Sequence, residues 1–83
     1  MSHARDVVEV IARGLSDEPQ NVKVTEAEHR GVSVVELFVA PRDLGRIIGR
    51  QGRTAAALRT LVAVTAERHG ARVTLEIREE ARR

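Results

Sequence analysis

The chain opens with apolar residues at helical spacing. Between residues 4 and 13 they recur every three or four positions, and charged side chains occupy positions between them. This is the period of an amphipathic helix. Ser2 is a suitable N-cap residue, and Gly14 suits the position just after the last turn. The pattern therefore predicts a first helix over residues 4–13. The apolar residues that recur at this spacing are Ala4, Val7, Val8, Ile11 and Leu15.

Two segments with the twofold period of β-strands follow this helix. Residues 22–28 alternate only partly, whereas residues 32–40 have apolar side chains on both faces of the strand. A strand that is apolar on both faces is typical of the centre of a sheet, and we expect Phe38 to lie in the core. The connection of residues 29–31 contains a glycine and has the length of a hairpin loop, so the two strands are predicted to be antiparallel.

The second half of the chain contains two helical segments and a final strand. Residues 42–48 and 53–69 have helical patterns and are separated by a glycine-containing interruption. The inward stripe of the longer helix consists of Ala55, Leu58, Leu61, Val62 and Thr65. Residues 72–78 alternate strictly, which predicts a strand, whereas residues 79–83 lack an apolar anchor and are expected to fray.

These elements occur in the order α-β-β-α-α-β within one small domain. The two strands that flank the helical pair are predicted to be parallel, because a long crossover joins them. The expected fold is therefore α+β, with a three-stranded mixed sheet and helices on one face. A single domain of residues 1–83, with an ordered core of about residues 4–78, accounts for the whole chain.

The composition of the chain excludes several classes of chemical site. The chain has no cysteine, which excludes disulfides, thiolate metal ligands and cysteine nucleophiles. No apolar run approaches the roughly 18 residues of a membrane span, so we expect a soluble, cytoplasmic protein without a membrane partner. His3, His29 and His69 lack the spacing of metal ligands, and no motif pairs a nucleophile with a general base. We therefore expect no enzyme activity, no cofactor and no metal site.

Positive charge is concentrated in one part of the chain. The net charge is only +2, but residues 42–59 contain five arginines and a single acidic residue, Asp43. A compact anion-binding surface has this distribution, and so does the solvated face of a helix. Charge alone leaves both interpretations open.

The sharpest feature lies between the two later helices, at Gly49-Arg50-Gln51-Gly52. Two glycines separated by two residues allow backbone angles that side chains forbid. The loop leads into the N-terminus of the long helix, where unpaired N–H groups and the helix dipole favour an anion such as phosphate. By itself, the spacing also fits a purely structural turn. A Walker A loop is excluded because no Gly-Lys-Ser/Thr is present, and a dinucleotide fingerprint fits poorly because the glycines follow a helical turn.

Residues 47–52, with the sequence Ile-Ile-Gly-Arg-Gln-Gly, resemble the signature of KH domains, and the α-β-β-α-α-β order resembles their type II form. The longer stretch of residues 39–54, together with residues 58–62, is similar to the small stand-alone bacterial KH proteins of the KhpA family. The resemblance extends over residues 4–77. It implies a type II KH domain that clamps the backbone of about four single-stranded RNA nucleotides, with their bases in an adjoining groove.

The same resemblance implies a cellular role and partners. It implies an RNA chaperone or post-transcriptional regulator that works with a larger KH/R3H protein, KhpB. It also implies a homodimer or a heterodimer with a KhpB-like protein, and a link to cell shape through cell length and the envelope. Two alternatives stay open. One is a protein-interaction or dimerisation module with incidental RNA contact, and the other is a ribosome-assembly factor that binds ribosomal RNA.

Individual residues of the loop and its flanks then receive roles in RNA binding. Gly49 and Gly52 would shape the turn, and Arg50 and Gln51 would face the phosphates. Two flanking arginines would add charge, and three apolar residues would line a floor for bases; these are Arg46, Arg53, Ile47, Ile48 and Ala56. For the two isoleucines a plain core role is the alternative. Because the chain has a single aromatic residue, binding is expected to depend on phosphates more than on base stacking.

Overall fold

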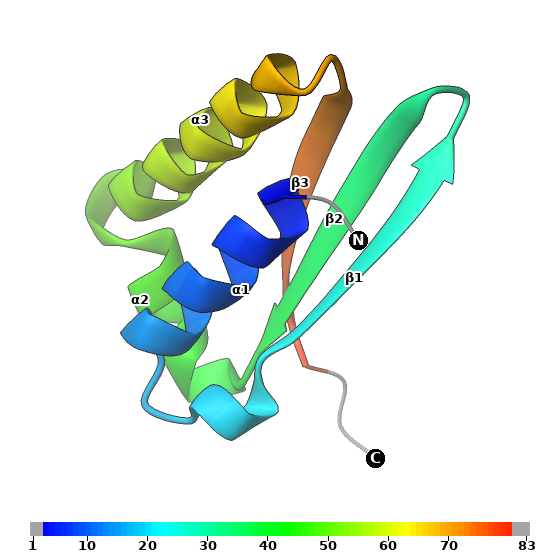
Figure 1. The fold of residues 1–83 in the computed structure, drawn as a ribbon. Helices are drawn as coiled ribbons and strands as arrows, with labels where there is room; N and C mark the ends of the chain where they lie inside the picture. Colours follow the sequence, from blue (N-terminus) through cyan, green and yellow to red (C-terminus); the bar gives the residue numbers. More distant parts are fainter. Residues whose placement is uncertain (1–2, 81–83) are drawn as a thin grey trace.

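A computed structural model describes residues 3–80 of the chain (Figure 1). Its elements in chain order are helix α1 (His3–Leu15), strands β1 (Lys23–His29) and β2 (Val32–Val39), helices α2 (Leu44–Ile48) and α3 (Arg53–Arg68), and strand β3 (Arg72–Glu79). Short 3-10 turns precede β1, α2 and α3. The order is the predicted α-β-β-α-α-β. The predicted N-cap residue, Ser2, and the tail residues 81–83 lie outside the described residues.

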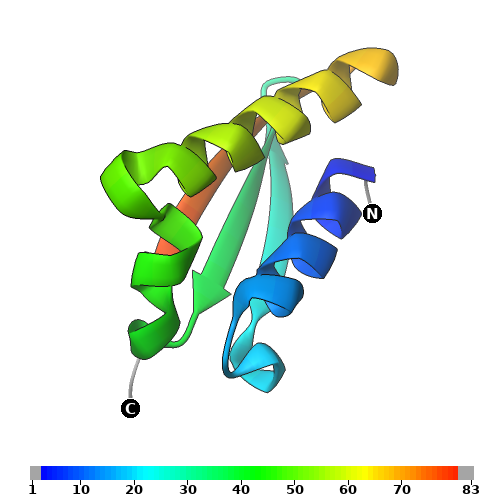
Figure 2. The same cartoon turned by 90° about the vertical axis from the view of Figure 1, so that its left-hand side faces the viewer.

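The three strands form one mixed sheet in the order β1-β2-β3. β1 and β2 are antiparallel and place Val24 opposite Leu37, whereas β2 and β3 are parallel and place Leu37 opposite Ile77. The long crossover through α2 and α3 makes this parallel pair possible. Figure 1 and Figure 2 show α1, α2 and α3 together on one face of the sheet. The predicted α+β fold is confirmed.

The core fills the space between the sheet and the helices. In the second half of β2, every second residue faces the helices and is completely buried, namely Val35, Leu37 and Val39. The other elements and the segment before β1 complete the core with Ala4, Val8, Ala12, Val22, Val24, Ile47, Leu58, Val62 and Leu75. β2 is also paired along both edges. It is therefore the central strand that its sequence predicts.

Phe38 does not lie in this core, and the sequence prediction for it is wrong. Side chains alternate along a strand, so Phe38 points to the face opposite to that of Leu37 and Val39. On that face Phe38 is partly exposed, between its register partners Lys23 and Arg78. The helices cover only the other face.

The end of α1 and the inward stripe of α3 also differ from the prediction. Gly14 lies inside α1, because the helix continues to Leu15. Ser16 follows the helix, and its backbone N–H and its Oγ both donate to the carbonyl oxygen of Ala12, at 3.1 and 2.7 Å. Leu61, which is predicted to face inward, is 47% exposed, and Leu15 at the end of α1 is 39% exposed.

The last strand is longer than its side-chain pattern predicts. β3 includes Glu79, and the N–H of Glu80 donates to the carbonyl oxygen of Val39 at 2.7 Å. The expected fraying is therefore wrong for these two residues. Backbone hydrogen bonds to β2 hold them in place without an apolar side chain.

Candidate nucleic-acid interface

The loop between α2 and α3 has a backbone conformation that most side chains resist. Gly49, Gln51 and Gly52 have φ angles of 78°, 57° and 74°, all in the left-handed region. A 3-10 turn over Arg50–Gly52 joins the two helices. The N–H of Gly49 donates to the carbonyl oxygen of Gly45 at 2.8 Å and closes the end of α2. Glycine at two of these positions relieves most of the strain of the turn.

The loop opens onto the N-terminus of α3, a helix of 16 residues. The N-cap residue, Gly52, has no side chain to cap the first turn, and no side-chain cap hydrogen bond is formed there. The N–H groups of the first turn and the positive end of the helix dipole together favour an anion. The backbone of this corner is thus suited to a phosphate group.

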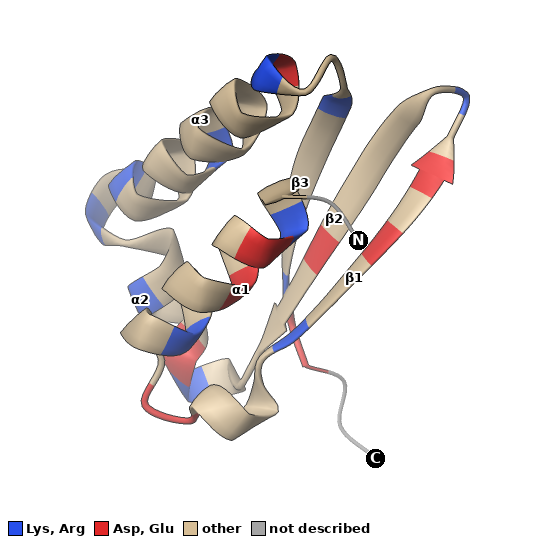
Figure 3. Ribbon diagram, viewed as in Figure 1, with Lys and Arg blue, Asp and Glu red and all other residues tan. Residues whose placement is uncertain are grey.

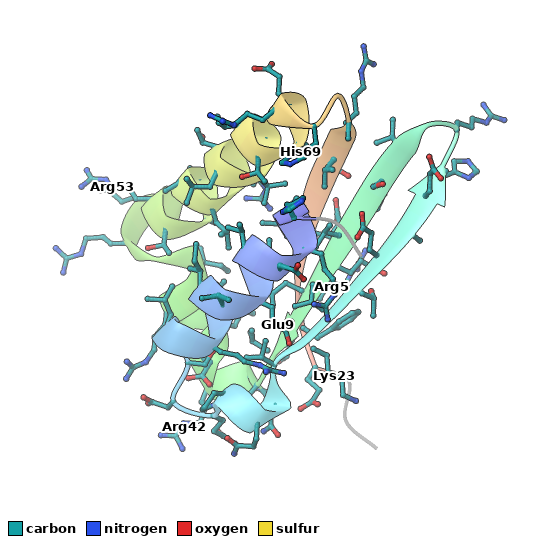
Figure 4. The ribbon with its side chains drawn as sticks, viewed as in Figure 1. Arg5, Glu9, Lys23, Arg42, Arg53 and His69 are labelled. Atoms are coloured by element: carbon teal, nitrogen blue, oxygen red, sulfur yellow. The ribbon has the colours of Figure 1, made fainter. Side chains whose placement is uncertain are left out.

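Arg50 in the loop and Arg53 just after it lack acidic partners in the part of the chain that the structure describes. Arg50 and Arg53 are both exposed, and neither forms an ion pair there. Arg53 Nη2 donates to Gln51 Oε1 at 3.0 Å, which holds the Gln51 amide beside the guanidinium group. Figure 4 shows Arg53 directed away from the body of the protein. No acidic residue occurs between residues 44 and 66, so this end of α3 is purely basic.

The two arginines that precede the loop are engaged in ion pairs. Arg46 Nη2 lies 3.0 Å from Asp17 Oδ2, and Arg42 Nε lies 3.6 Å from Glu18 Oε2. Both acidic residues belong to the turn after α1, which Figure 3 shows in red beside α2. Arg46, which precedes the loop by three residues, therefore has an acidic partner, Asp17, that its sequence neighbourhood does not supply.

Asp43 fixes that turn against α2. Its side chain is completely buried, and its two carboxylate oxygens accept the N–H groups of Asp17 at 2.9 Å and Glu18 at 3.0 Å. The hydrogen bond from Asp17 is the main cause that lowers the pKa of Asp43. The hydrogen bond from Glu18 and the guanidinium groups of Arg42 and Arg46 add to it, whereas burial opposes it. Asp43 is therefore ionised at neutral pH.

The three apolar candidates differ in burial. Ile47 has no exposed surface and belongs to the core, so the core alternative holds for it and it cannot touch a base. Its burial anchors α2, and with it the start of the loop, to the sheet. Ile48 is 39% exposed, and Ala56 is exposed as well. These two residues are available to a ligand beside the loop.

Sequence reasoning missed the surface further along α3. Ala56, Arg59 and Ala63 share one side of the helix, because successive members are three and four residues apart. Ala63 also borders a hollow of about 430 Å³ between the end of α3 and the start of β3. The hollow is lined by Ala63, Ala66, Glu67, Gly70, Ala71, Arg72 and Val73. Arg59 is exposed and has no ion pair among the described residues. The helical spacing of small residues is the signal that identifies this side.

The histidines do not assemble a metal site. Within residues 3–80, no group of three or more potential ligand side chains could hold a metal ion. His3 and His69 instead stack their rings, with centroids 4.2 Å apart, and join the start of α1 to the end of α3. In the described part of the chain, no helix combines the length and the apolar character needed to cross a membrane.

Two solved structures share this fold. Aquifex aeolicus Era bound to GDP·AlF4− matches with a TM-score of 0.63 at 23% sequence identity, over 93% of this chain and 30% of the Era chain. Era in complex with MgGDPNP and nucleotides 1506–1542 of 16S ribosomal RNA matches with a TM-score of 0.61 at 24% identity, over 92% of this chain and 29% of the other. This chain therefore corresponds to less than a third of Era. The likeness identifies the fold as a type II KH domain.

Curated relatives match the chain over most of its length. RNA-binding protein KhpA of Aquifex aeolicus is 47% identical over 79 residues, which cover 95% of this chain and 100% of the relative. The proteins of the same name from Caldanaerobacter subterraneus and Clostridium perfringens are 44% and 41% identical, over 87% and 88% of this chain and 96% and 97% of the relatives. All three are named as RNA-binding proteins and not as enzymes. A family model described as KhpA/KhpB, KH domain, matches residues 5–77, and the chain belongs to this family.

Proposed function

We propose that this chain binds single-stranded RNA and that residues 49–52 clamp its sugar–phosphate backbone. One observation carries the proposal. A left-handed glycine loop, the uncapped N-terminus of α3, and Arg50 and Arg53 without acidic partners in the described chain all meet at one corner. Each of these favours a phosphate group. Relatives of nearly the same length, named RNA-binding protein KhpA, support the proposal.

Beyond the loop, one side of α3 offers a path for the RNA strand. The path begins at Ile48 and Ala56, passes Arg59 and reaches the hollow at the far end of the helix. From Arg53 to Ala66 the helix rises roughly 20 Å. This length suits the roughly four nucleotides that a KH domain holds. Small side chains let bases approach the helix closely, and Arg59 supplies a positive charge midway.

Binding along this path is expected to depend on phosphate contacts. Phe38, the only phenylalanine, tyrosine or tryptophan of the chain, lies on the face of the sheet that the helices do not cover. The loop therefore has no aromatic side chain on which bases could stack. If three or four phosphates are neutralised, the logarithm of the binding constant should fall against the logarithm of the salt concentration with a slope of roughly −2 to −3.

Charge reversal at the tip of the loop tests the proposal. The variant Arg50→Asp/Gln51→Asp should bind a mixed-sequence single-stranded RNA at least about tenfold more weakly, with an unchanged far-UV circular dichroism spectrum. The matched control, His29→Asp/Arg30→Asp, alters the formal charge equally at the exposed β1–β2 hairpin and should bind RNA almost as the wild type does. Undiminished RNA affinity in a folded loop variant would exclude the loop as the clamp.

We further propose that the chain acts in the cytoplasm as an RNA chaperone or post-transcriptional regulator with a role in cell shape. It would work as a dimer or together with a KhpB-like KH/R3H protein. The family model that covers both KhpA and KhpB supports a shared activity. In addition, α3 exposes two large apolar residues one turn apart, Leu61 at 47% and Val64 at 51%. Such residues favour contact with an apolar surface of another chain.

The same apolar residues favour the alternative of an interaction module with incidental RNA contact. The loop variant distinguishes the two functions, because Leu61 and Val64 are unaffected by it. If RNA binding is the function, the variant loses its cellular activity even though it keeps its protein partner. If docking is the function, the variant keeps both.

A further inference from the structure

A turn with two acidic residues is fixed beside the basic flank of the loop. Residues 16–18 follow α1, and we call them the acidic turn. Buried Asp43 accepts the N–H groups of both Asp17 and Glu18. At the other end, Ser16 is bonded to the last turn of α1 through its N–H and its Oγ. The acidic turn cannot move away from α2 without losing these hydrogen bonds.

The acidic turn neutralises the arginine that lies nearest to the loop on α2. Arg46 precedes Gly49 by three residues, so it lies within one helical turn of the loop. Arg46 Nη2 and Asp17 Oδ2 are 3.0 Å apart, and the two side chains are 58% and 44% exposed. An ion pair this exposed is weak, and another anion can compete for it. A phosphate that approaches the same edge of the Arg46 guanidinium group competes with Asp17 for it.

We propose that Asp17 sets the strength of RNA binding by competing with a phosphate for Arg46. This inference rests on the proposed function, and it extends it to a residue outside the loop and outside α3. Bound RNA is held by Arg50 and Arg53, while Asp17 occupies Arg46. The affinity and the number of neutralised phosphates are therefore lower than the arginine count of the loop region would give.

The variant Asp17→Asn tests the competition, because it removes the charge and nearly preserves the size of the side chain. Both hydrogen bonds to Asp43 come from backbone N–H groups, so the turn should keep its place. Asp17→Asn also removes the longer ion pair between Asp17 Oδ2 and Arg42 Nη2, which are 3.8 Å apart, but Arg42 keeps its ion pair with Glu18. We expect the affinity for a short, mixed-sequence single-stranded RNA to rise about two- to fivefold, the range for release of the exposed ion pair with Arg46. The salt slope should steepen by about 0.7, which corresponds to one additional phosphate.

Glu28→Gln is the control for net charge. It makes the same change in charge at an exposed position near the β1–β2 hairpin, where no ion pair is formed within the described residues. Its RNA affinity and its salt slope should equal those of the wild type. If Glu28→Gln and Asp17→Asn raise the affinity equally, the gain comes from the change in net charge alone and the proposal is overturned.

Arg46→Gln tests whether the gain from Asp17→Asn acts through the ion pair with Arg46 or through the general negative potential of Asp17. In the wild type this change should weaken RNA binding only slightly, because Arg46 is already occupied. In the Asp17→Asn background it should cancel the gain, since the two residues are coupled in a double-mutant cycle. A gain that persists with glutamine at position 46 refutes the competition.

The loop variant Arg50→Asp/Gln51→Asp keeps this inference distinct from the proposed function. If that variant binds RNA as the wild type does, the loop mechanism is refuted, and the role of Asp17 is refuted with it. If the loop variant loses RNA binding while Asp17→Asn gains none, only the role of Asp17 is overturned. A urea unfolding curve of Asp17→Asn that matches the wild type verifies that the acidic turn is still held.

Discussion

The backbone of Gly49 runs directly against Thr54 in the first turn of α3. A Cβ atom at position 49 would lie 2.7 Å from Thr54 Cβ and 2.9 Å from the backbone nitrogen of Thr54. At Gly52, by contrast, a Cβ atom would have no other atom within 4 Å. Both glycines have positive φ angles. Gly49 is therefore needed for its angle and for its lack of a side chain, and Gly52 for its angle alone.

Gly49→Ala should accordingly destabilise the fold more than Gly52→Ala. A left-handed alanine costs about 1–2 kcal/mol in free energy of unfolding, which is our expectation for Gly52→Ala, and the contact with Thr54 should bring Gly49→Ala above about 2 kcal/mol. Gly45→Ala is the control, because Gly45 lies inside α2 with open space around it. It should be neutral or slightly stabilising. Urea unfolding measures all three, and equal losses at 49 and 52 would contradict the steric argument.

Asp43→Asn should lower stability at neutral pH and have less effect in acid. The hydrogen bond from Asp17 is the main cause that lowers the pKa of the Asp43 carboxyl in the folded state, and the hydrogen bond from Glu18 and the nearby guanidinium groups add to it against the opposing effect of burial. Its stabilisation is therefore complete above the ordinary aspartate pKa of about 4 and is lost as the pH falls through the lower folded-state value. Urea midpoints of the wild type and the variant should differ at pH 7 and converge as the pH falls below the lowered folded-state pKa of Asp43. Glu9, whose pKa is lowered mainly by its hydrogen bond from Arg5, is present in both proteins and cancels in the comparison. A difference that does not change with pH would argue against the ionised Asp43.

Arg59→Gln should weaken RNA binding if the strand follows α3. Removal of one phosphate contact is expected to lower the affinity a few-fold and to make the salt slope shallower by about 0.7. Arg68→Gln is the matched control on the same helix. Arg68 is nine residues further on, which places it on the opposite side of α3. Fluorescence anisotropy with labelled RNA measures both variants, and equal losses would mean that Arg59 contributes only general charge.

Leu61→Asp should abolish dimer formation while leaving the fold of the protein intact. Leu61 is 47% exposed, so its loss should cost less than about 1 kcal/mol in free energy of unfolding. Leu58, which is 2% exposed, should cost about 2–5 kcal/mol when changed to alanine. Sedimentation velocity should show a dimer for the wild type and a monomer for Leu61→Asp. Thr25→Asp, an exposed change on β1, should remain dimeric. A dimer that survives Leu61→Asp would place the interface elsewhere.

Local sequence patterns were sufficient to predict the helices, the strands and the glycine loop. The apolar faces of β2 predict a central strand, and the crossover length predicts the parallel pairing that the structure has. Gly49 and Gly52 have positive φ angles, which glycine adopts without strain, so these angles could be expected from the residue type alone. In each case, the deciding interaction lies within a few residues of the sequence or within one connection.

The remaining features depend on contacts between distant segments. Because β2 is apolar on both faces, its own pattern cannot tell which face meets the helices. The neighbouring strands decide this, since they place Val24 and Leu75 on one face and leave Phe38 on the other. Likewise, the ion pair of Arg46 with Asp17 exists because buried Asp43 holds the acidic turn. No local pattern encodes an ion-pair partner that lies 29 residues away in the sequence.

Helix α3 exposes a basic residue on one side and two large apolar residues on another. Arg59 and Ala63 lie along the proposed RNA path, and Ala63 borders the hollow, whereas Leu61 and Val64 project from a different side of the helix. Two copies joined through Leu61 would therefore leave both glycine loops open to solvent. Such a dimer would bind two separate stretches of RNA and raise the effective concentration of one stretch near the other. Strand annealing would then be accelerated by tethering alone, with no nucleotide hydrolysis and no moving part.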